Sequence, residues 1–249
     1  MRRRFTLPRL GLLLAGLLGC LGGELPFEPL PEGGHHVLFI GNSLTYFNDL
    51  PGTLAHLAES AGDTIRVKSV AEPDFAVIDH ALGASNAVEV IRKERWQYVI
   101  LQQGPTPLPL YRDTLIRATQ LLDPPIRAAG AISAQLMVWT PASRPELYEA
   151  VKLSCRLAAE AVGGVVFPAG EAWRAALAAD PQLPLYASDG FHPAPLGTYL
   201  AALVLYEKIT GHDARNLPPV AVAGGQTLTI PEATIRLLQQ VAHEAAAAP

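Results

Sequence analysis

The sequence predicts an α/β fold in which helices cover both faces of a central, mostly parallel sheet of five strands. Short apolar runs alternate with helical stretches from His35 onward, an order typical of parallel strands joined by crossover helices. These runs are nearly continuous in apolar character, as expected of strands buried on both faces. A chain of 249 residues is long enough to bury one large core. We therefore expect a single domain over residues 35–249.

Each expected element follows from a local pattern. β-branched or apolar runs predict strands at 37–40, 65–70, 98–101, 132–139 and 165–167. Helical spacing predicts helices near 50–61, 86–93, 111–129, 145–161, 195–210 and 230–247. Sites in such sheets lie beyond the carboxyl ends of the strands. The segments that follow the first three strands are therefore expected to form the site.

The N-terminus has the pattern of an export signal. Three arginines at 2–4 precede an uncharged run over 10–19, the order of a secretory signal, and the run is short for a bilayer span. It ends in Leu-Leu-Gly-Cys at Cys20, which resembles a bacterial lipobox. We therefore expect a lipoprotein-type signal peptide over 1–19, a lipid on Cys20 and a Gly- and Pro-rich tether over 20–34. The alternative is a plain signal peptide of a secreted or periplasmic protein, or an uncleaved anchor, with an incidental cysteine.

Charge and cysteine content exclude several classes of function. Cleavage before Cys20 removes four of the 19 basic residues and none of the 23 acidic ones, so the formal charge falls from −4 to −8. Nucleic acid is then not expected as a partner. Cys155 remains as a lone thiol at a helical, apolar spacing, which predicts a buried residue rather than a disulfide. No metal-ligand spacing or phosphate-binding loop occurs, so neither a metal nor a cofactor is expected.

Ser43 is the candidate nucleophile. In "FIGNSLTYFND" the first apolar run stops at Gly41 and then presents Asn42 and Ser43. A serine hydroxyl at the end of a strand is reactive only if a neighbouring base takes its proton, and histidine is the side chain best suited to do so. Residues 46–48 are expected to shape the loop that follows.

His192 is the best candidate for the base. It stands in "SDGFHPAPLGTYLAALVL", where Asp189 precedes it by three residues, so one loop can turn the carboxylate back toward the imidazole. His80, next to Asp79 near a strand end, remains an alternative. The other histidines are more simply surface or capping residues: His35, His36, His56, His212 and His243. An isolated Asp-x-x-His pair is also typical of a capped loop with a solvated histidine.

Taken together, the two ends of the chain resemble the SGNH (GDSL-like) hydrolase superfamily. Its first motif, usually Gly-Asp-Ser, is matched by Gly41, Asn42 and Ser43, and its last, Asp-x-x-His, by Asp189 and His192. "NDLPGTLAHLAESAG", "VILQQG" and "PAGEAW" look like an exported bacterial branch whose first motif reads GNS. The resemblance implies a flavodoxin-like three-layer α/β/α fold without a cofactor. It also implies Ser43 as nucleophile, His192 as base and Asp189 as the acid that orients it.

The resemblance also implies an oxyanion hole made of three donors. The family uses the N–H of the nucleophile, a glycine N–H after the second strand and an asparagine side chain after the third. In "AEPDFAVIDHA" the glycine position is Asp74, whose N–H survives the substitution and which tolerates unusual φ angles. In "LQQGPTP" the asparagine position falls on Thr106. Gln103 is the better amide donor nearby, so we expect Ser43, Asp74 and Gln103, with Thr106 as the alternative to Gln103.

These observations predict a serine ester hydrolase, an esterase or deacetylase that forms an acyl-enzyme. Its expected substrate is an extracytoplasmic ester, such as an O-acetylated carbohydrate or an acyl ester. Two alternatives remain at this point: a non-catalytic envelope module that binds a glycan or peptide in the same cleft, and an acyltransferase. The sequence leaves the substrate and the oligomeric state open.

Overall fold

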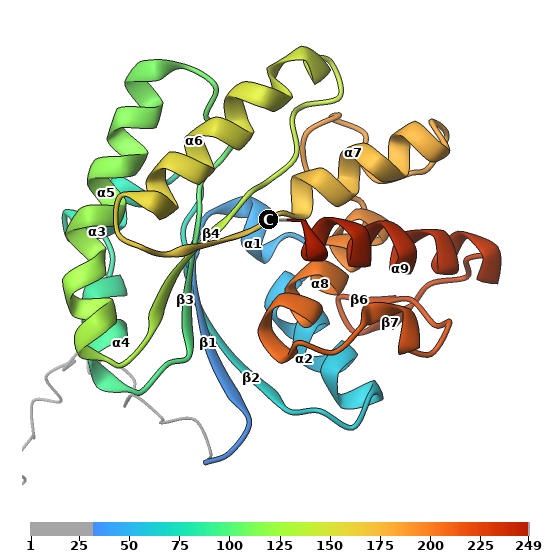
Figure 1. The fold of residues 1–249 in the computed structure, drawn as a ribbon, viewed down its shortest axis with the longest axis horizontal. Coiled ribbons are helices and arrows are strands. Elements are labelled where there is room, and N and C mark those ends of the chain that lie inside the picture. The colour runs from blue at the N-terminus through green and yellow to red at the C-terminus, as the bar shows by residue number, and fades with distance from the viewer. Residues whose placement is uncertain (1–31, 249) are drawn as a thin grey trace, which may run out of the picture.

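The computed structural model describes residues 32–248. In this part of the chain, a five-stranded sheet lies between two layers of helices (Figure 1). Its strands follow the order β2-β1-β3-β4-β5, and every pairing is parallel. This is the flavodoxin-like strand order. The predicted fold class is confirmed, with a main sheet that is entirely parallel. Its strands are β1 (His35–Gly41), β2 (Ile65–Ala71), β3 (Tyr98–Gln102), β4 (Ile132–Leu136) and β5 (Val165–Phe167).

The helices and a small hairpin complete the described residues. The α-helices are α1 (Ser43–Tyr46), α2 (Leu50–Ser60), α3 (Val77–Ala81), α4 (Ala87–Lys93), α5 (Pro109–Ala128), α6 (Tyr148–Glu160), α7 (Ala169–Ala179), α8 (Pro195–Thr210) and α9 (Glu232–Ala247). The 3₁₀ turns η1 (Pro145–Leu147) and η2 (Ala214–Asn216) precede α6 and follow α8. The antiparallel strands β6 (Val222–Ala223) and β7 (Gln226–Thr227) lie between α8 and α9.

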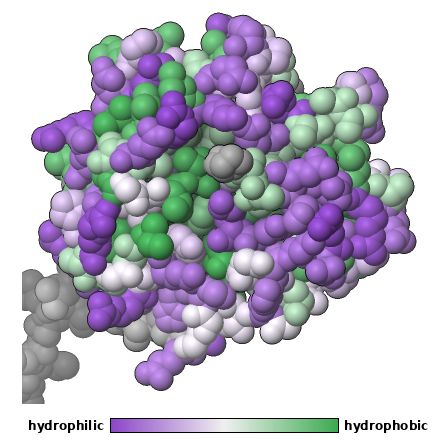
Figure 2. Space-filling view, viewed as in Figure 1, coloured by the Kyte–Doolittle hydropathy of each residue, from purple (hydrophilic) through white to green (hydrophobic). Residues whose placement is uncertain are grey.

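Two apolar cores hold the layers together. Val37 and Phe39 of β1 pack into a core with α2, α7 and α8, whereas Leu38 and Ile40 pack into a core with α3, α4 and α5. Successive strand residues face opposite sides of a sheet, so one continuous apolar strand supplies both cores. Helix α9 packs on α7 and α8, and its outer face is hydrophilic (Figure 2).

Several predicted boundaries change in the structure. Strand β4 ends at Leu136, three residues before Trp139, because its ladder with β5 stops where Leu136 pairs with Phe167. The predicted helix over 145–161 begins as the turn η1, and α5 begins two residues earlier than expected. The sequence did not predict α1 and α3, which are too short to show a period, or the alanine-rich helix α7.

The N-terminal predictions fall mostly outside the described residues. These are the signal peptide over 1–19, the lipid on Cys20 and all but the last residues of the tether over 20–34. Among residues 32–248, no helix combines the length and the apolar character needed to cross a bilayer.

Cys155 is buried in α6, as its helical spacing predicted, and is a free thiol. Burial raises the pKa of this thiol to about 12. The thiolate is the reactive form of cysteine, so both burial and the raised pKa disfavour reaction at Cys155.

Candidate active site

The turn after β1 presents Ser43 at the start of a helix. Asn42 caps α1: its side-chain oxygen accepts the N–H of Leu44 at 3.1 Å, and its amide nitrogen donates to the carbonyl of Phe75 at 2.8 Å. Ser43 is therefore the first residue of α1. The first N–H groups of a helix have no acceptor within it. The N–H of Ser43 is thus available to a ligand, while that of Leu44 is taken by the cap.

Gln102 fixes this turn from the neighbouring strand. Its Oε1 accepts the N–H of Asn42 at 2.9 Å and the hydroxyl of Thr45 at 2.8 Å. A Cβ on Gly41 would lie 2.5 Å from Gln102 Oε1, so only glycine leaves room for this contact. Gln102 was not singled out in the sequence. The available signal was its position at the end of β3, the strand that pairs with β1.

Ser43, His192 and Asp189 form one hydrogen-bonded chain. His192 Nε2 lies 3.0 Å from Ser43 Oγ, and His192 Nδ1 lies 2.6 Å from Asp189 Oδ2. A carboxylate can only accept, so Nδ1 carries the proton and the lone pair on Nε2 faces the serine hydroxyl. The hydrogen bond from His192 is the main reason why the pKa of Asp189 is lowered to about 2. The arrangement is that of a nucleophile, a base and an orienting carboxylate.

The loop that carries His192 and Asp189 is tightly bonded. Asp189 Oδ1 accepts the N–H groups of Phe191 and His192, each at 2.9 Å, and the His192 carbonyl accepts the N–H of Ala187 at 2.8 Å. The ring of Phe47 stacks on the imidazole with centroids 4.6 Å apart. Ring and backbone of His192 are therefore both held in place.

A cavity of about 250 Å³ opens beside Ser43 at the carboxyl ends of β1, β2 and β3. Its lining includes all the residues expected to form the oxyanion hole. The lining residues are Asn42, Ser43, Asp74, Phe75, Ala76, Gln103, Gly104, Pro105, Thr106, Tyr111 and Phe191. The structure therefore brings the segments after the first three strands to one place, next to the His192 loop.

Asp74 lies at the third position of a turn in which the Phe75 N–H donates to the Glu72 carbonyl at 3.4 Å. Its φ is +60°. A positive φ at this position is the feature of a type II turn, which favours glycine and tolerates few other residues. Asp74 thus keeps the backbone geometry of a glycine position, and its exposed carboxylate lies at the rim of the cavity.

Gln103 and Thr106 are bonded to each other. Gln103 Nε2 donates to Thr106 Oγ1 at 2.9 Å, and Thr106 Oγ1 donates its single hydrogen to the Gly104 carbonyl at 2.8 Å. Gln103 Oε1 accepts the N–H of Val77 at 3.1 Å. An amide nitrogen carries two hydrogens, so Gln103 retains a second hydrogen for a ligand, whereas the Thr106 hydroxyl has already used its own.

His80, the alternative base, lies in a different environment. It is fully buried, with Nε2 2.8 Å from the Gly41 carbonyl and Nδ1 2.7 Å from Ser85 Oγ. Burial lowers the pKa of His80. Nε2 must donate to the carbonyl, so the imidazole joins α3 to the end of β1, and neither of its nitrogens is bonded to Ser43.

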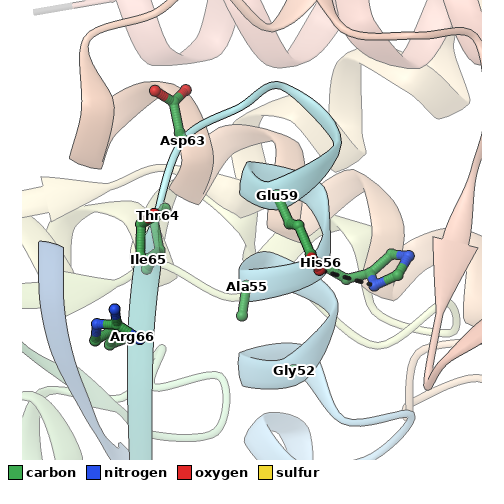
Figure 3. Close-up of a pocket in the computed structure, with 8 residues that line it drawn as sticks. All are labelled: Gly52, Ala55, His56, Glu59, Asp63, Thr64, Ile65 and Arg66. Carbon is green, nitrogen blue, oxygen red and sulfur yellow. Dashed lines mark ion pairs between the residues drawn. The ribbon is translucent and has the colours of Figure 1, made fainter. Parts of the chain in front are cut away.

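A larger cavity of about 460 Å³ lies away from these residues, between α2 and the start of β2 (Figure 3). Its histidine, His56, lies 3.9 Å from Glu59 on the same helix. Neither residue is joined to a serine or threonine hydroxyl in the way that His192 is joined to Ser43. Size therefore does not identify the candidate site, because the smaller cavity is the one that lies beside the Ser43–His192–Asp189 chain.

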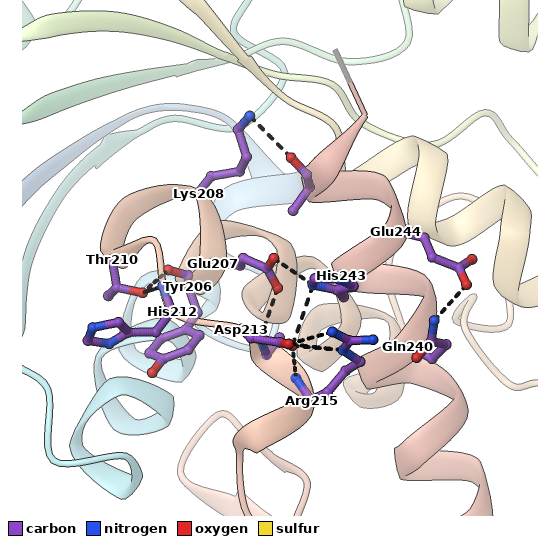
Figure 4. Close-up of polar contacts among 12 residues, drawn as sticks. Tyr206, Glu207, Lys208, Thr210, His212, Asp213, Arg215, Gln240, His243 and Glu244 are labelled. Atoms are coloured by element: carbon purple, nitrogen blue, oxygen red, sulfur yellow. Dashed lines mark hydrogen bonds and ion pairs between the residues drawn. The ribbon is translucent and has the colours of Figure 1, made fainter.

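One cluster has ligand atoms close enough for a metal ion among the described residues: Glu207, Asp213 and His243, between α8 and α9 (Figure 4). Arg215 Nη2 lies 2.6 Å from Asp213 Oδ2, and the N–H of Ala214 donates to Glu207 Oε2 at 2.9 Å. These internal donors already occupy the carboxylates, so the cluster is explained as a tie between two helices.

Comparison with known proteins identifies the fold. No protein-family model and no curated protein matches the chain, whereas solved structures do. A DUF4886 family protein from Bacteroides uniformis is 20% identical with a TM-score of 0.73, covering 85% of this chain and 94% of its own. A protein from Slackia heliotrinireducens assigned to the SGNH hydrolases is 25% identical with a TM-score of 0.58, covering 70% and 98%. The esterase EstA from Pseudoalteromonas is 14% identical with a TM-score of 0.52, covering 70% and 95%.

These neighbours are SGNH and GDSL-like hydrolases together with a DUF4886 family protein, and this chain shares their fold. They support the superfamily that the first and last motifs indicated. The narrower prediction, an exported branch with a GNS first motif, stays a prediction.

Proposed function

We propose that the protein is a serine hydrolase that cleaves carboxylic esters through an acyl-enzyme. The observation that carries the proposal is the hydrogen-bonded chain from Ser43 through His192 to Asp189, beside a cavity at the carboxyl edge of the sheet. Structural neighbours described as an esterase, a lipase/acylhydrolase and an SGNH hydrolase support ester bonds as the target.

In the first half of the reaction, Ser43 Oγ attacks the ester carbonyl while its proton passes to His192 Nε2. The imidazolium that forms is stabilised by Asp189, which already accepts the hydrogen of Nδ1. His192 then gives the proton to the leaving alcohol oxygen. The C–O bond of the ester breaks and an ester to Ser43 takes its place.

The negative oxygen of the tetrahedral intermediate needs donors that are already in place. The N–H groups of Ser43 and Asp74 and the second amide hydrogen of Gln103 are the three that we assign to it. Each such donor typically contributes about 3–4 kcal/mol to lowering the barrier. The positive φ of Asp74 supports this assignment, because it reproduces the backbone of the expected glycine.

In the second half, water takes the place of the alcohol. His192 removes a proton from the water, the hydroxide attacks the acyl carbonyl, and the proton returns to Ser43 Oγ as the acid leaves. These steps require only the three side chains and the oxyanion donors, so we assign no cofactor to the reaction.

The lipobox-like sequence at Cys20 supports a lipid-anchored protein of a bacterial envelope, with secretion or the periplasm as the alternative. We therefore expect an extracytoplasmic substrate, an O-acetylated carbohydrate or an acyl ester. A screen of acetylated glycans against aryl esters of graded acyl length distinguishes these classes by their kcat/KM values.

The direct test is labelling with a fluorophosphonate probe together with turnover of a short aryl acetate. We expect wild-type protein to be labelled and active, and Ser43→Ala to lose both. Ser69→Ala, at an exposed position on β2, is the matched control and should behave as wild type. A folded wild-type protein that neither reacts with the probe nor turns over esters contradicts the proposal.

Asp74 favours a second candidate function. Its exposed carboxylate at the cavity rim would oppose an oxyanion if it turned inward, which suits a module that binds a glycan or peptide without catalysis. Absence of probe labelling combined with saturable glycan binding supports that function instead. An acyltransferase would use the same residues, and an acyl product formed on an added sugar alcohol identifies it.

A further inference from the structure

The carbonyl groups on both sides of His192 accept side-chain N–H groups from distant parts of the chain. Trp139 Nε1 donates to the carbonyl of Phe191 at 2.9 Å, and Asn48 Nδ2 donates to the carbonyl of Pro193 at 2.8 Å. Trp139 follows β4, and Asn48 follows α1. The catalytic imidazole is therefore held between two anchors that belong to different elements.

The two anchors differ in what they connect. Trp139 is 2% exposed and stacks on Trp173 with ring centroids 3.8 Å apart, so it ties the His192 loop to the core. Asn48 is half-buried and lies five residues after Ser43, on the segment that carries the nucleophile. Asn48 thus ties the segment that follows the nucleophile to the backbone next to His192, beside the stacking of Phe47 on the imidazole.

Asn48 is itself rigidly placed. Its φ is +53°, a left-handed conformation that asparagine tolerates better than most residues. Its carbonyl accepts the hydroxyl of Thr53 on α2 at 3.3 Å, and its amide nitrogen also donates to Thr198 Oγ1 at 3.1 Å on α8. Both hydrogens of the amide are thus used, one on the loop after His192 and one on the helix that the loop enters.

We propose that Asn48 is a positioning residue that sets the distance between Ser43 Oγ and His192 Nε2. The inference rests on the proposed function. Without the Asn48 amide, the Pro193 end of the loop loses its link to the nucleophile turn, while the Trp139 anchor still holds the Phe191 end. A misplacement of about 1 Å in a catalytic group can cost about 10²-fold in rate.

Three variants separate this role from general stabilisation. Asn48→Gly keeps a residue suited to positive φ and removes the amide. Asn48→Asp keeps the shape and the tolerance of positive φ but replaces two donors with acceptors. Thr198→Val removes only the second acceptor and leaves the bond to Pro193. Asn86→Asp, at an exposed position before α4 that has no capping bond, is the matched control.

The measurements are the second-order rate of fluorophosphonate labelling, kcat and KM for a short aryl acetate, and Tm. We expect Asn48→Gly and Asn48→Asp to lower kcat and the labelling rate by about 10- to 100-fold, with KM changed by less than about threefold. Thr198→Val should lower kcat and the labelling rate by less than about fivefold. Equal labelling rates in wild type and both Asn48 variants overturn the inference.

A second measurement does not depend on activity. In ¹⁵N-labelled protein, the ring signals of His192 report its hydrogen bonds, and we expect them to shift in both Asn48 variants and to stay unchanged in Asn86→Asp. Unchanged His192 signals in folded Asn48 variants overturn the inference even if turnover falls. If wild-type protein does not react with the probe, the proposed function fails, and these signals alone decide whether Asn48 positions His192.

Discussion

Two histidine–carboxylate clusters in this protein are built from the same groups and differ in their surroundings. His192 Nδ1 lies 2.6 Å from Asp189 Oδ2, and His243 Nδ1 lies 2.8 Å from Glu207 Oε1, with Asp213 Oδ1 at 3.4 Å (Figure 4). Both clusters contain an aspartate whose pKa is lowered to about 2. A carboxylate beside an imidazole, with a depressed pKa, therefore does not by itself identify a catalytic site.

The difference lies on the other side of the imidazole. His192 Nε2 faces the hydroxyl of Ser43 at the edge of a cavity, on the side of the sheet where parallel α/β folds place their sites. His243 lies between α8 and α9, and the largest cause of the low pKa of Asp213 is the guanidinium of Arg215. One cluster has a hydroxyl to activate, and the other joins two helices.

The largest expected effect comes from removing each imidazole. We expect His192→Ala to lower kcat/KM for an aryl acetate by about 10⁴-fold or more, because Ser43 loses its base. His243→Ala should leave kcat/KM within about twofold and lower the free energy of unfolding by about 1 kcal/mol through lost hydrogen bonds. Kinetics and urea unfolding of both variants check this. Loss of turnover in a fully folded His243→Ala protein would contradict the purely structural role of the His243 cluster.

The second test replaces the aspartate of each cluster with asparagine. Asp189→Asn removes the acceptor that fixes the tautomer of His192 and stabilises the imidazolium, so we expect kcat to fall by roughly 10²–10⁴-fold. Asp213→Asn removes a partner of Arg215 at the helix pair and should leave kcat within about twofold. Steady-state kinetics decide between them, and equal losses in both variants would show that the two clusters are coupled.

His80 is a third histidine, and among the described residues its ring nitrogens are bonded to a carbonyl and a hydroxyl rather than to a carboxylate. We expect His80→Leu to lower the free energy of unfolding by about 1–3 kcal/mol, since the Gly41 carbonyl and the Ser85 hydroxyl lose a partner. His56→Leu, whose side chain is 54% exposed in wild type, is the control.

The stability conferred by His80 should also depend on pH. Its pKa lies below the ordinary value of 6.5 when folded, so below about pH 6.5 the unfolded chain binds a proton that the folded chain does not. Wild-type stability from this group is therefore complete above pH 6.5 and decreases as the pH falls toward the folded pKa. Urea unfolding between pH 5 and 7 should show a flatter dependence in His80→Leu, and an equally steep one would contradict this explanation.

The sequence was sufficient for the sheet, because its signals are local. Continuous apolar runs placed β1, β2, β3 and β5 to within two residues. The parallel direction of the strands follows from their alternation with helices. The end of β4 was wrong because it depends on where its partner β5 stops pairing. A boundary set by another strand cannot be read from the residues of one strand.

The same limit applies to the candidate site. Ser43, His192 and Asp189 stand in recognisable motifs, and the structure places them together. The roles of Gln102 and Asn48 depend on contacts made across 60 and 145 residues of sequence. Gln102 and Gln103 are adjacent and chemically identical, yet one supports the turn of Ser43 and the other lines the cavity. Their roles differ because Gln102 is the last residue of β3, whereas Gln103 is the first residue of the loop that follows.

The smallest expected effect concerns what holds each aspartate ionised. Both carboxylates should stay charged at pH 4, so the stability they confer is complete above the ordinary pKa of 3.8 and is lost as the pH falls through about 2. His192→Ala removes the largest cause for Asp189 and should raise its pKa toward 3.8 while that of Asp213 stays near 2. Arg215→Ala should do the reverse. Carboxyl ¹³C titrations of the two variants measure both groups at once. If either substitution moved both pKa values, the two clusters would not be electrostatically independent.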